Sequence, residues 1–165
     1  FPLPGPEGRS VIVYVIGSMR NPNIPQIGNR LREAGYDVFE DWFSPGPQAD
    51  QEWQQYEKVR GRSYREALRG HHARQVFEFD LHHLNRAHVG ILVMPAGKSA
   101  HIELGYLIGQ GKPAFVLFDG EPERYDIMYQ FATDIFFTAD ELLNELKTYE
   151  TQNFRRTVDH APWNS

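Results

Sequence analysis

The chain has 165 residues, a length that suits one domain with one hydrophobic core. Hydrophobic residues make up 41% and charged residues 24% of the chain, a balance that excludes a disordered or fibrous protein. Lys and Arg total 17 against 22 for Asp and Glu, and the net charge of −5 argues against a general binder of nucleic acids or anionic membranes. Because the chain has no cysteine, disulfides, thiolate metal ligands and a cysteine nucleophile are excluded.

The first part of the chain predicts a strand, a helix and a second strand. Residues 1–10 are rich in proline and glycine and are expected to form a flexible lead-in. Residues 11–16 are β-branched apart from Tyr14, which predicts a strand buried on both faces, as in a parallel sheet. Apolar residues spaced for one helix face follow over 24–34, and residues 36–39 predict the next strand. This βαβ order with short connections is typical of a parallel sheet.

Two segments in the middle of the chain have less regular patterns. Residues 41–55 include Pro45, Gly46 and Pro47, and their poor periodicity predicts a long loop over the sheet edge. Residues 58–74 carry six basic residues and one acidic residue. This basic segment is either a solvated helix face or a rim that attracts a phosphate.

The second half of the chain alternates helices and strands. The expected elements are a helix over 73–86, a strand over 89–94, a helix over 99–109, a strand over 114–118, a short helix over 125–132, a strand over 135–137 and a final helix opened by a capping box of Thr138 and Glu141. Residues 150–165 are expected to form a polar tail. The sequence therefore predicts a single α/β domain over residues 11–149, built on five strands.

An aspartate interrupts the apolar face of the predicted helix over 73–86. The inward stripe by 3.6-residue spacing consists of Val76, Phe77, Asp80, Leu81 and Leu84. Burial raises the pKa of a carboxyl group and favours its protonated form, unless donors or a cation reach it. Asp80 is therefore a candidate general acid, or else an aspartate satisfied by a backbone amide or by Arg74.

The predicted helix over 99–109 is apolar around nearly its whole circumference, so we expect it to lie within the fold. Glu103 is its one acidic residue, in the first turns beyond the strand over 89–94, where open α/β sheets bind ligands. The positive end of the helix favours an ionised Glu103 by about 0.3–1 kcal/mol. An ionised Glu103 and a protonated Asp80 would form a nucleophile and acid pair. The alternative is a glutamate present only to interact with the helix dipole.

The turn after the first strand offers groups that can bind an anion. Gly17, Ser18, Met19 and Arg20 supply backbone N–H groups, a hydroxyl and a guanidinium, which together can hold a phosphate. The pattern matches neither a Walker A loop nor the Gly-x-Gly-x-x-Gly fingerprint. No metal site is expected, because the histidines come mainly as adjacent pairs whose side chains diverge on a helix.

These residues together resemble the nucleoside 2-deoxyribosyltransferase superfamily, which includes the 2'-deoxynucleoside 5'-phosphate N-hydrolases. The motifs that carry the resemblance are Tyr14 with the turn 17–20, Phe79-Asp80-Leu81, the strand 90–94, Glu103-Leu104-Gly105-Tyr106 and Gly111-Lys112-Pro113. The resemblance implies a flavodoxin-like, Rossmann-like parallel sheet with helices on both faces, and cleavage of an N-glycosidic bond without a cofactor. It also implies that Glu103 attacks C1' of the sugar, that Asp80 assists protonation of the departing base and that Tyr14 orients the glutamate.

Part of the chain departs from the family pattern. The turn over 17–20 is more similar to the phosphate-binding turn of the monophosphate hydrolases than to that of the transferases. Six residues before the glutamate, transferases carry aspartate and monophosphate hydrolases carry serine, whereas this chain has Gly97, and Ser99 is the candidate substitute. The insertion over 42–69 is a further departure.

We expect the protein to cleave the N-glycosidic bond of a nucleoside 5'-monophosphate, in its 2'-deoxy or its ribose form, and to release the free base. Three alternatives stay open: a base-exchanging nucleoside 2-deoxyribosyltransferase, a non-catalytic nucleotide sensor, and a glycohydrolase that acts on a nicotinamide dinucleotide. The expected partners are small nucleotides or nucleosides, not a nucleic acid polymer or a membrane. The resemblance implies a homodimer or larger homo-oligomer, and the expected location is the cytoplasm.

Overall fold

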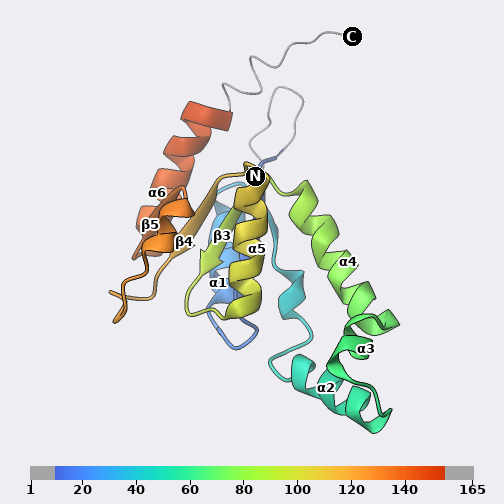
Figure 1. Cartoon of the computed structure of the whole chain (residues 1–165). Helices are drawn as coiled ribbons and strands as arrows, with labels where there is room; N and C mark the ends of the chain where they lie inside the picture. The colour runs from blue at the N-terminus through green and yellow to red at the C-terminus, as the bar shows by residue number, and fades with distance from the viewer. Residues whose placement is uncertain (1–9, 155–165) are drawn as a thin grey trace, which may run out of the picture.

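The computed structural model describes residues 10–154, which form a five-stranded sheet between two layers of helices (Figure 1). The strands are β1 (Ile12–Ile16), β2 (Asp37–Phe39), β3 (Val89–Val93), β4 (Ala114–Leu117) and β5 (Asp134–Phe136). They pair in the order β2-β1-β3-β4-β5, and every pairing is parallel. The predicted flavodoxin-like fold is therefore confirmed. The predictions for residues 1–9 and 155–165 lie outside the described residues.

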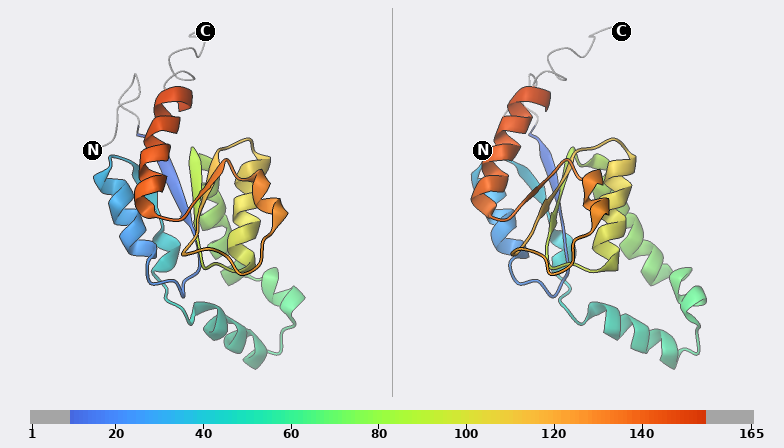
Figure 2. Two further views of the ribbon diagram at one scale, coloured as in Figure 1. Left: turned by 90° about the vertical axis from the view of Figure 1, so that its left-hand side faces the viewer. Right: turned by 60° about the vertical axis from the view of Figure 1, so that its left-hand side comes forward.

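Helices cover both faces of the sheet (Figure 2). One face packs on α1 (Ile24–Glu33) and α6 (Ala139–Tyr149), and the other on α4 (His71–Arg86) and α5 (Lys98–Gly109). Alternation along β1 divides its side chains between the two cores: Val13 joins the first, whereas Tyr14 joins the second with Leu84 and Leu107. Tyr14 is thereby turned toward α4 and α5.

The short elements also follow the prediction in part. The structure contains the 3-10 helices η1 (Asp41–Phe43) and η2 (Ile127–Phe131), and the π-helix η3 (Glu150–Phe154). The Thr138 hydroxyl caps α6 as predicted by accepting a hydrogen bond from the Glu141 amide. The expected polar tail begins with an anchored residue, because Glu150 is buried and accepts a 3.0 Å hydrogen bond from the Tyr36 hydroxyl. None of the helices between residues 10 and 154 is long and apolar enough to cross a membrane.

The expectation of a loop over 41–55 is wrong, since much of this segment is helical. Two helices, α2 (Ala49–Val59) and α3 (Tyr64–Leu68), connect η1 to α4. Their stability is local: the buried Glu57 pairs with Arg62 at 3.1 Å, and Ser63 and Glu66 form a capping box. Because these helices bury few apolar side chains, no apolar periodicity marks them in the sequence.

An arm of residues 49–78 projects away from the sheet (Figures 1 and 2). It consists of α2, α3 and the first half of α4. Its exposed large apolar side chains are Tyr56, Val59, Tyr64, Leu68, Val76 and Phe77. The prediction that Val76 and Phe77 face inward is therefore wrong. The helical period agrees with the structure, but the first turns of α4 extend past the body of the protein, where Val76 and Phe77 stay exposed.

The outer face of α5 is also exposed, which corrects the expectation that this helix is enclosed. Ile102 is 73% exposed, and Tyr106 is 38% exposed. A Cβ atom added at Gly105 or Gly109 would meet no other atom within 4 Å. Packing on the sheet covers only the side of α5 that carries Ala100, Leu104 and Leu107.

The strand order marks the carboxyl ends of β1 and β3 as the place where a ligand is expected. The chain moves from β1 outward to β2 and then crosses back to β3, so the topological switch lies between β1 and β3. Ligands of open α/β sheets bind at such a point. The turn 17–20 follows β1, the loop 94–97 follows β3, and the buried Asn21 joins them by a 3.4 Å hydrogen bond from its side-chain amide to the Met94 carbonyl.

Candidate active site

Three side chains that are distant in the sequence meet on the face of the sheet that packs on α4 and α5. Tyr14 comes from β1, Asp80 from the middle of α4 and Glu103 from the second turn of α5. The Tyr14 hydroxyl lies close enough to interact electrostatically with both carboxylates, and the two carboxylates interact with each other. The structure thus brings together the three residues that the sequence predicts as catalytic.

Hydrogen bonds between α4 and α5 hold this arrangement. The side chain of Asn85, five residues after Asp80, accepts hydrogen bonds from the Tyr106 hydroxyl at 2.6 Å and from the Gln110 amide at 3.0 Å. Lys112 Nζ donates to the Leu84 and Asn85 carbonyls at 2.9 and 2.8 Å, near the end of α4. The Tyr106 and Lys112 positions of the family-like motifs therefore have a structural role: they fix one acid-bearing helix against the other.

Two oxygens of the cluster are buried without a partner. Tyr14 Oη and Glu103 Oε2 have no hydrogen-bond partner among residues 10–154. A buried polar group left unsatisfied costs about 1–3 kcal/mol, so native proteins keep few of them. The two groups interact, yet neither oxygen completes a well-formed hydrogen bond. Such a pair is unusual for a purely structural cluster and marks a candidate functional site.

Burial also sets the protonation of the two acids. It raises the pKa of Glu103 to about 7, an effect that the Tyr14 hydroxyl opposes and the charge of Asp80 reinforces. Burial alone raises the pKa of Asp80 to about 6. Burial and then the negative charges of Glu103 and Asp80 raise the pKa of Tyr14, which stays protonated.

The raised pKa of Asp80 agrees in direction with the expected protonated acid, whereas the raised pKa of Glu103 is opposite in direction to the expected ionised carboxylate. The helix dipole stabilises an ionised glutamate by about 0.3–1 kcal/mol. A pKa change from 4.5 to about 7 corresponds to about 3 kcal/mol in the opposite direction. Burial therefore outweighs the dipole.

Asp80 has no counter-ion. It forms no hydrogen bond or ion pair with any residue between 10 and 154, so Arg74 does not neutralise it. Arg74 is exposed on the first turns of α4, beyond the sheet. The alternative interpretation of Asp80 as a satisfied structural aspartate lacks its partner within the described chain.

The turn after β1 presents an unpaired cation. The Ser18 hydroxyl oxygen accepts a 3.1 Å hydrogen bond from the Arg20 amide, and the Asn21 side chain accepts one of 3.0 Å from the Asn23 amide. The Arg20 guanidinium is exposed and forms no ion pair with a described residue. A Cβ atom at Gly17 would lie 2.5 Å from the Ile24 side chain, so glycine permits the turn to pack closely on α1. Sequence reasoning missed Asn21, although an asparagine beside a proline after a strand is a turn signal.

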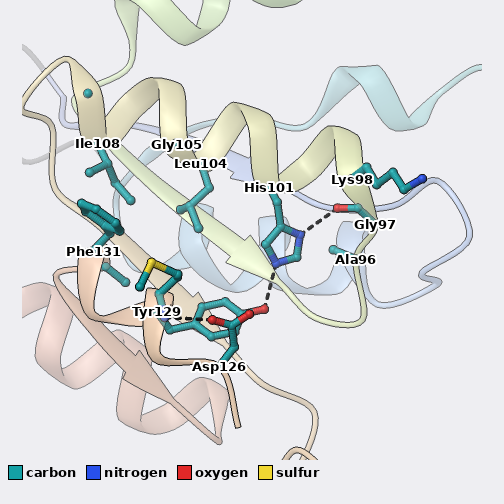
Figure 3. A pocket seen from close by; sticks show the side chains of 13 residues that line it. Ala96, Gly97, Lys98, His101, Leu104, Gly105, Ile108, Asp126, Tyr129 and Phe131 are labelled. Carbon is teal, nitrogen blue, oxygen red and sulfur yellow. Dashed lines mark hydrogen bonds between the residues drawn. The ribbon is translucent and has the colours of Figure 1, made fainter. Parts of the chain in front are cut away.

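Gly97 lines a cavity that neither of the two acids lines. Gly97 and Lys98 line a cavity of about 700 Å³ between α5 and η2 (Figure 3). His101 spans it with hydrogen bonds of 2.7 Å to the Gly97 carbonyl and 2.8 Å to the Tyr129 hydroxyl. Glu103 lies two residues beyond His101, about 200° around the helix, and does not line this cavity.

The remaining predicted site features are simple to place. Ser99 is exposed in the first turn of α5, and Met19 is half-buried in the turn after β1. Within residues 10–154, no group of three or more His, Asp or Glu side chains is arranged to hold a metal ion. The chemistry that the cluster offers is that of two carboxyl groups and a phenol.

Comparison with known proteins identifies the fold. No protein-family model and no curated protein matches the chain. Among solved structures, it is similar to a 2-deoxyribosyltransferase from the psychrotolerant bacterium Bacillus psychrosaccharolyticus, with a TM-score of 0.53 and 18% identity over 81% of this chain and 90% of that one. It also aligns with the CMP N-glycosidase BcmB of Clostridium botulinum, with a TM-score of 0.46 and 17% identity over 82% of this chain and 98% of that one. The first likeness agrees with the fold expected from the family resemblance.

We expect Glu103→Gln to raise the free energy of unfolding by about 2–3 kcal/mol near pH 8, because it removes a carboxylate that burial penalises when ionised. The folded pKa of about 7 lies above the usual value of 4.5, so the penalty is small below about pH 4.5, grows up to about pH 7 and is constant above it. Urea denaturation across this pH range measures the gain.

The control for this measurement is Glu145→Gln, which removes the same charge from an exposed position on α6. It should change the free energy of unfolding by less than about 0.5 kcal/mol at every pH. A gain for Glu103→Gln that does not vary with pH, or no gain near pH 8, contradicts the assignment of a buried, raised-pKa carboxyl group.

Proposed function

We propose that the protein cleaves the N-glycosidic bond of a nucleoside or 2'-deoxynucleoside 5'-monophosphate, with Glu103 as nucleophile and Asp80 as proton donor. The observation that carries the proposal is the pairing of two carboxyl groups of raised pKa beside the Tyr14 hydroxyl of β1, with one oxygen of Tyr14 and one of Glu103 buried and unsatisfied. Breaking a C1'–N bond builds positive charge on the sugar and negative charge on the base. One carboxylate and one acid meet those two demands.

The reaction proceeds in two steps in this proposal. A Glu103 oxygen attacks C1', the C1'–N bond breaks with its electron pair moving to the base, and Asp80 gives its proton to a base nitrogen. Water then attacks C1' of the glycosyl ester, loses a proton to Asp80 and frees Glu103. Tyr14 donates a hydrogen bond that orients the Glu103 carboxylate. The products are the free base and the sugar phosphate, and both acids return to their starting states.

The protonation of the pair suits this sequence of steps. Between the two pKa values of about 6 and about 7, the interacting carboxyl groups together hold about one proton. Positive charge developing at C1' stabilises the ionised Glu103, and a base nitrogen that accepts a hydrogen bond favours the proton on Asp80. Substrate binding therefore drives the proton to the residue that needs it.

The turn after β1 supports a monophosphate as substrate. Ser18 and Arg20 lie at the carboxyl end of the strand that carries Tyr14, and the Arg20 guanidinium has no described ion-pair partner. A charge-assisted hydrogen bond contributes about 1.5–3 kcal/mol. The two side chains together can favour a monophosphate over the parent nucleoside by roughly a hundredfold.

A base-exchanging transferase is the second candidate. It uses the same glycosyl ester, with a second base in place of water, and the chain shares its fold with the 2-deoxyribosyltransferase of Bacillus psychrosaccharolyticus. Gly97 lacks the acidic side chain that transferases carry at this place, which counts against base exchange, although it also lacks the serine of the monophosphate hydrolases. Adding a second free base to the reaction and looking for a new nucleoside separates the two reactions.

We also propose that the protein forms a homodimer through the outer face of α5. Ile102 and Tyr106 are exposed there, and the space around Gly105 and Gly109 is open enough for another helix to approach closely. An apolar strip on one helix is complementary to itself across a two-fold axis. The cytoplasmic location stays a prediction.

Incubation of the four common 2'-deoxynucleoside 5'-monophosphates with the protein, followed by chromatography of free base, tests the reaction. We expect release by the wild type and by Glu145→Gln, and at least about a thousandfold slower release by Glu103→Gln, because the nucleophile is lost. Equal release by Glu103→Gln and the wild type, or no release by the wild type from nucleotides or nucleosides, contradicts the proposal.

Arg20→Ala tests phosphate recognition. We expect it to raise KM for the monophosphate by about 10- to 150-fold and to leave KM for the parent nucleoside nearly unchanged, because only the monophosphate offers the guanidinium an anionic partner. Arg69→Ala, which removes an exposed arginine of the arm, is the matched control. Similar losses on both substrates would remove phosphate binding from the role of Arg20.

Ile102→Asp tests the dimer. We expect light scattering after size-exclusion chromatography to report a dimer for the wild type and a monomer for Ile102→Asp, because the variant places a charge in the centre of the apolar strip. Val59→Asp, at an 83% exposed position on α2, should remain dimeric. A monomeric wild type at micromolar concentration contradicts the interface.

A further inference from the structure

Phe77 is a large aromatic side chain that the described chain leaves uncovered. It is 62% exposed and makes no ring contact with any residue between 10 and 154. By contrast Phe79, also exposed on α4, packs against Phe39 and His83 with ring centroids 5.7 and 4.9 Å away. Phe79 therefore has a structural partner, whereas Phe77 has none.

The helical period places Phe77 on the same side of α4 as the candidate acid. Asp80 follows Phe77 by three positions, which corresponds to a rotation of 300° and a rise of about 4.5 Å along the helix axis. The two side chains thus leave the helix about 60° apart, on adjacent turns. Leu84, four residues after Asp80, is buried in the core between α4 and the sheet and marks this side as the one that faces the sheet.

The Phe77 side chain leaves α4 on the side that faces the sheet, but this turn of the helix lies beyond the end of the sheet. The first half of α4 belongs to the projecting arm (Figures 1 and 2), so no strand lies opposite this turn to cover the ring. The ring therefore lies one helical turn before Asp80 on the same side of α4, and it stays exposed there. Along α4, the order is the buried Leu84, then the acid, then the exposed aromatic ring.

We infer that the turn of α4 preceding Asp80 forms a binding subsite for the planar heteroaromatic base, with Phe77 as the ring on which the base stacks. This inference rests on the proposed function, because it takes Asp80 as the group that protonates the departing base. A base held by Asp80 at its edge has its face free, and the side chain one helical turn away is an aromatic ring. Stacking offers the apolar ring a partner that the folded chain does not supply.

Stacking on Phe77 predicts how the subsite recognises its ligand. Every nucleobase has a π-face, so a stacking contact tolerates different bases and contributes affinity to all of them. Phe77 should therefore strengthen the binding of each nucleotide and contribute nothing to a sugar phosphate without a base. Discrimination among bases must come from hydrogen bonds at the base edge, where Asp80 lies.

The alternative place for the base is the cavity on the opposite side of α5. Phe131, which is 69% exposed, lines that cavity together with Met128 and Ile108 (Figure 3). A base bound there would be separated from Asp80 by the body of α5. Phe77 and Phe131 are the same residue type at similar exposure on the two sides of one helix, which makes each the control for the other.

Calorimetric titration of Glu103→Gln, which stops turnover, tests the subsite. The ligands are the four common 2'-deoxynucleoside 5'-monophosphates and 2-deoxyribose 5-phosphate. We expect the added change Phe77→Ala to weaken binding of all four nucleotides by about 5- to 150-fold and to leave binding of the sugar phosphate unchanged. Phe77→Trp should keep nucleotide affinity, because it retains an aromatic face, and Phe131→Ala should leave all five affinities unchanged.

Each contrary result overturns the subsite. Nucleotide affinity that survives Phe77→Ala removes the stacking role, and a loss seen with Phe131→Ala instead moves the base to the cavity beside η2. Equal losses for nucleotides and for the sugar phosphate show an effect on the fold or the sugar. If nucleotides bind in a Phe77-dependent way but the wild type releases no base, the proposed reaction fails and the subsite stands. If no nucleotide binds, the subsite fails.

Discussion

The burial of two carboxyl groups beside one phenol is the constraint on which the rest of this structure depends. Moving a carboxylate out of water disfavours its charged form, and here no described cation or hydrogen-bond donor compensates Asp80. The consequence is a pair of acids that exchange protons near neutral pH instead of near pH 4. A protein gains no stability from such an arrangement, which is why it marks a candidate functional site.

The parallel topology explains how the two acids come together. β1 is central in the strand order, and alternation along it turns Tyr14 toward the layer that contains α4 and α5. Because both helices precede or follow β3, they run side by side on that face, and Asn85 joins them through hydrogen bonds from α5. Two acids on neighbouring helices, each facing the other helix and the sheet, are then close without being close in sequence.

Much of this arrangement could be predicted from the sequence, and the failures have physical causes. Asp80 and Glu103 stood out because each is a charge among apolar neighbours, and the β-branched run around Tyr14 marks a buried strand. The helices of the arm were missed because ion pairs and caps around Glu57 and Ser63 stabilise them, and these leave no apolar period. The raised pKa of Glu103 comes mainly from burial, which is a property of the fold, whereas the sequence reveals only the helix dipole.

The inward stripe on α4 failed in an informative way. The period correctly placed Phe77 on one side with Asp80 and Leu84, yet only Leu84 of the three is buried. A pattern of apolar residues therefore predicts which side of a helix avoids water, but not whether the chain itself or a ligand covers that side. The apolar strip of α5 around Ile102 has the same property. Glu103 lies between these two uncovered surfaces. A base bound on one side and a second copy of the chain on the other would each exclude water from Glu103. The desolvation that raises the pKa of Glu103 would then depend on both.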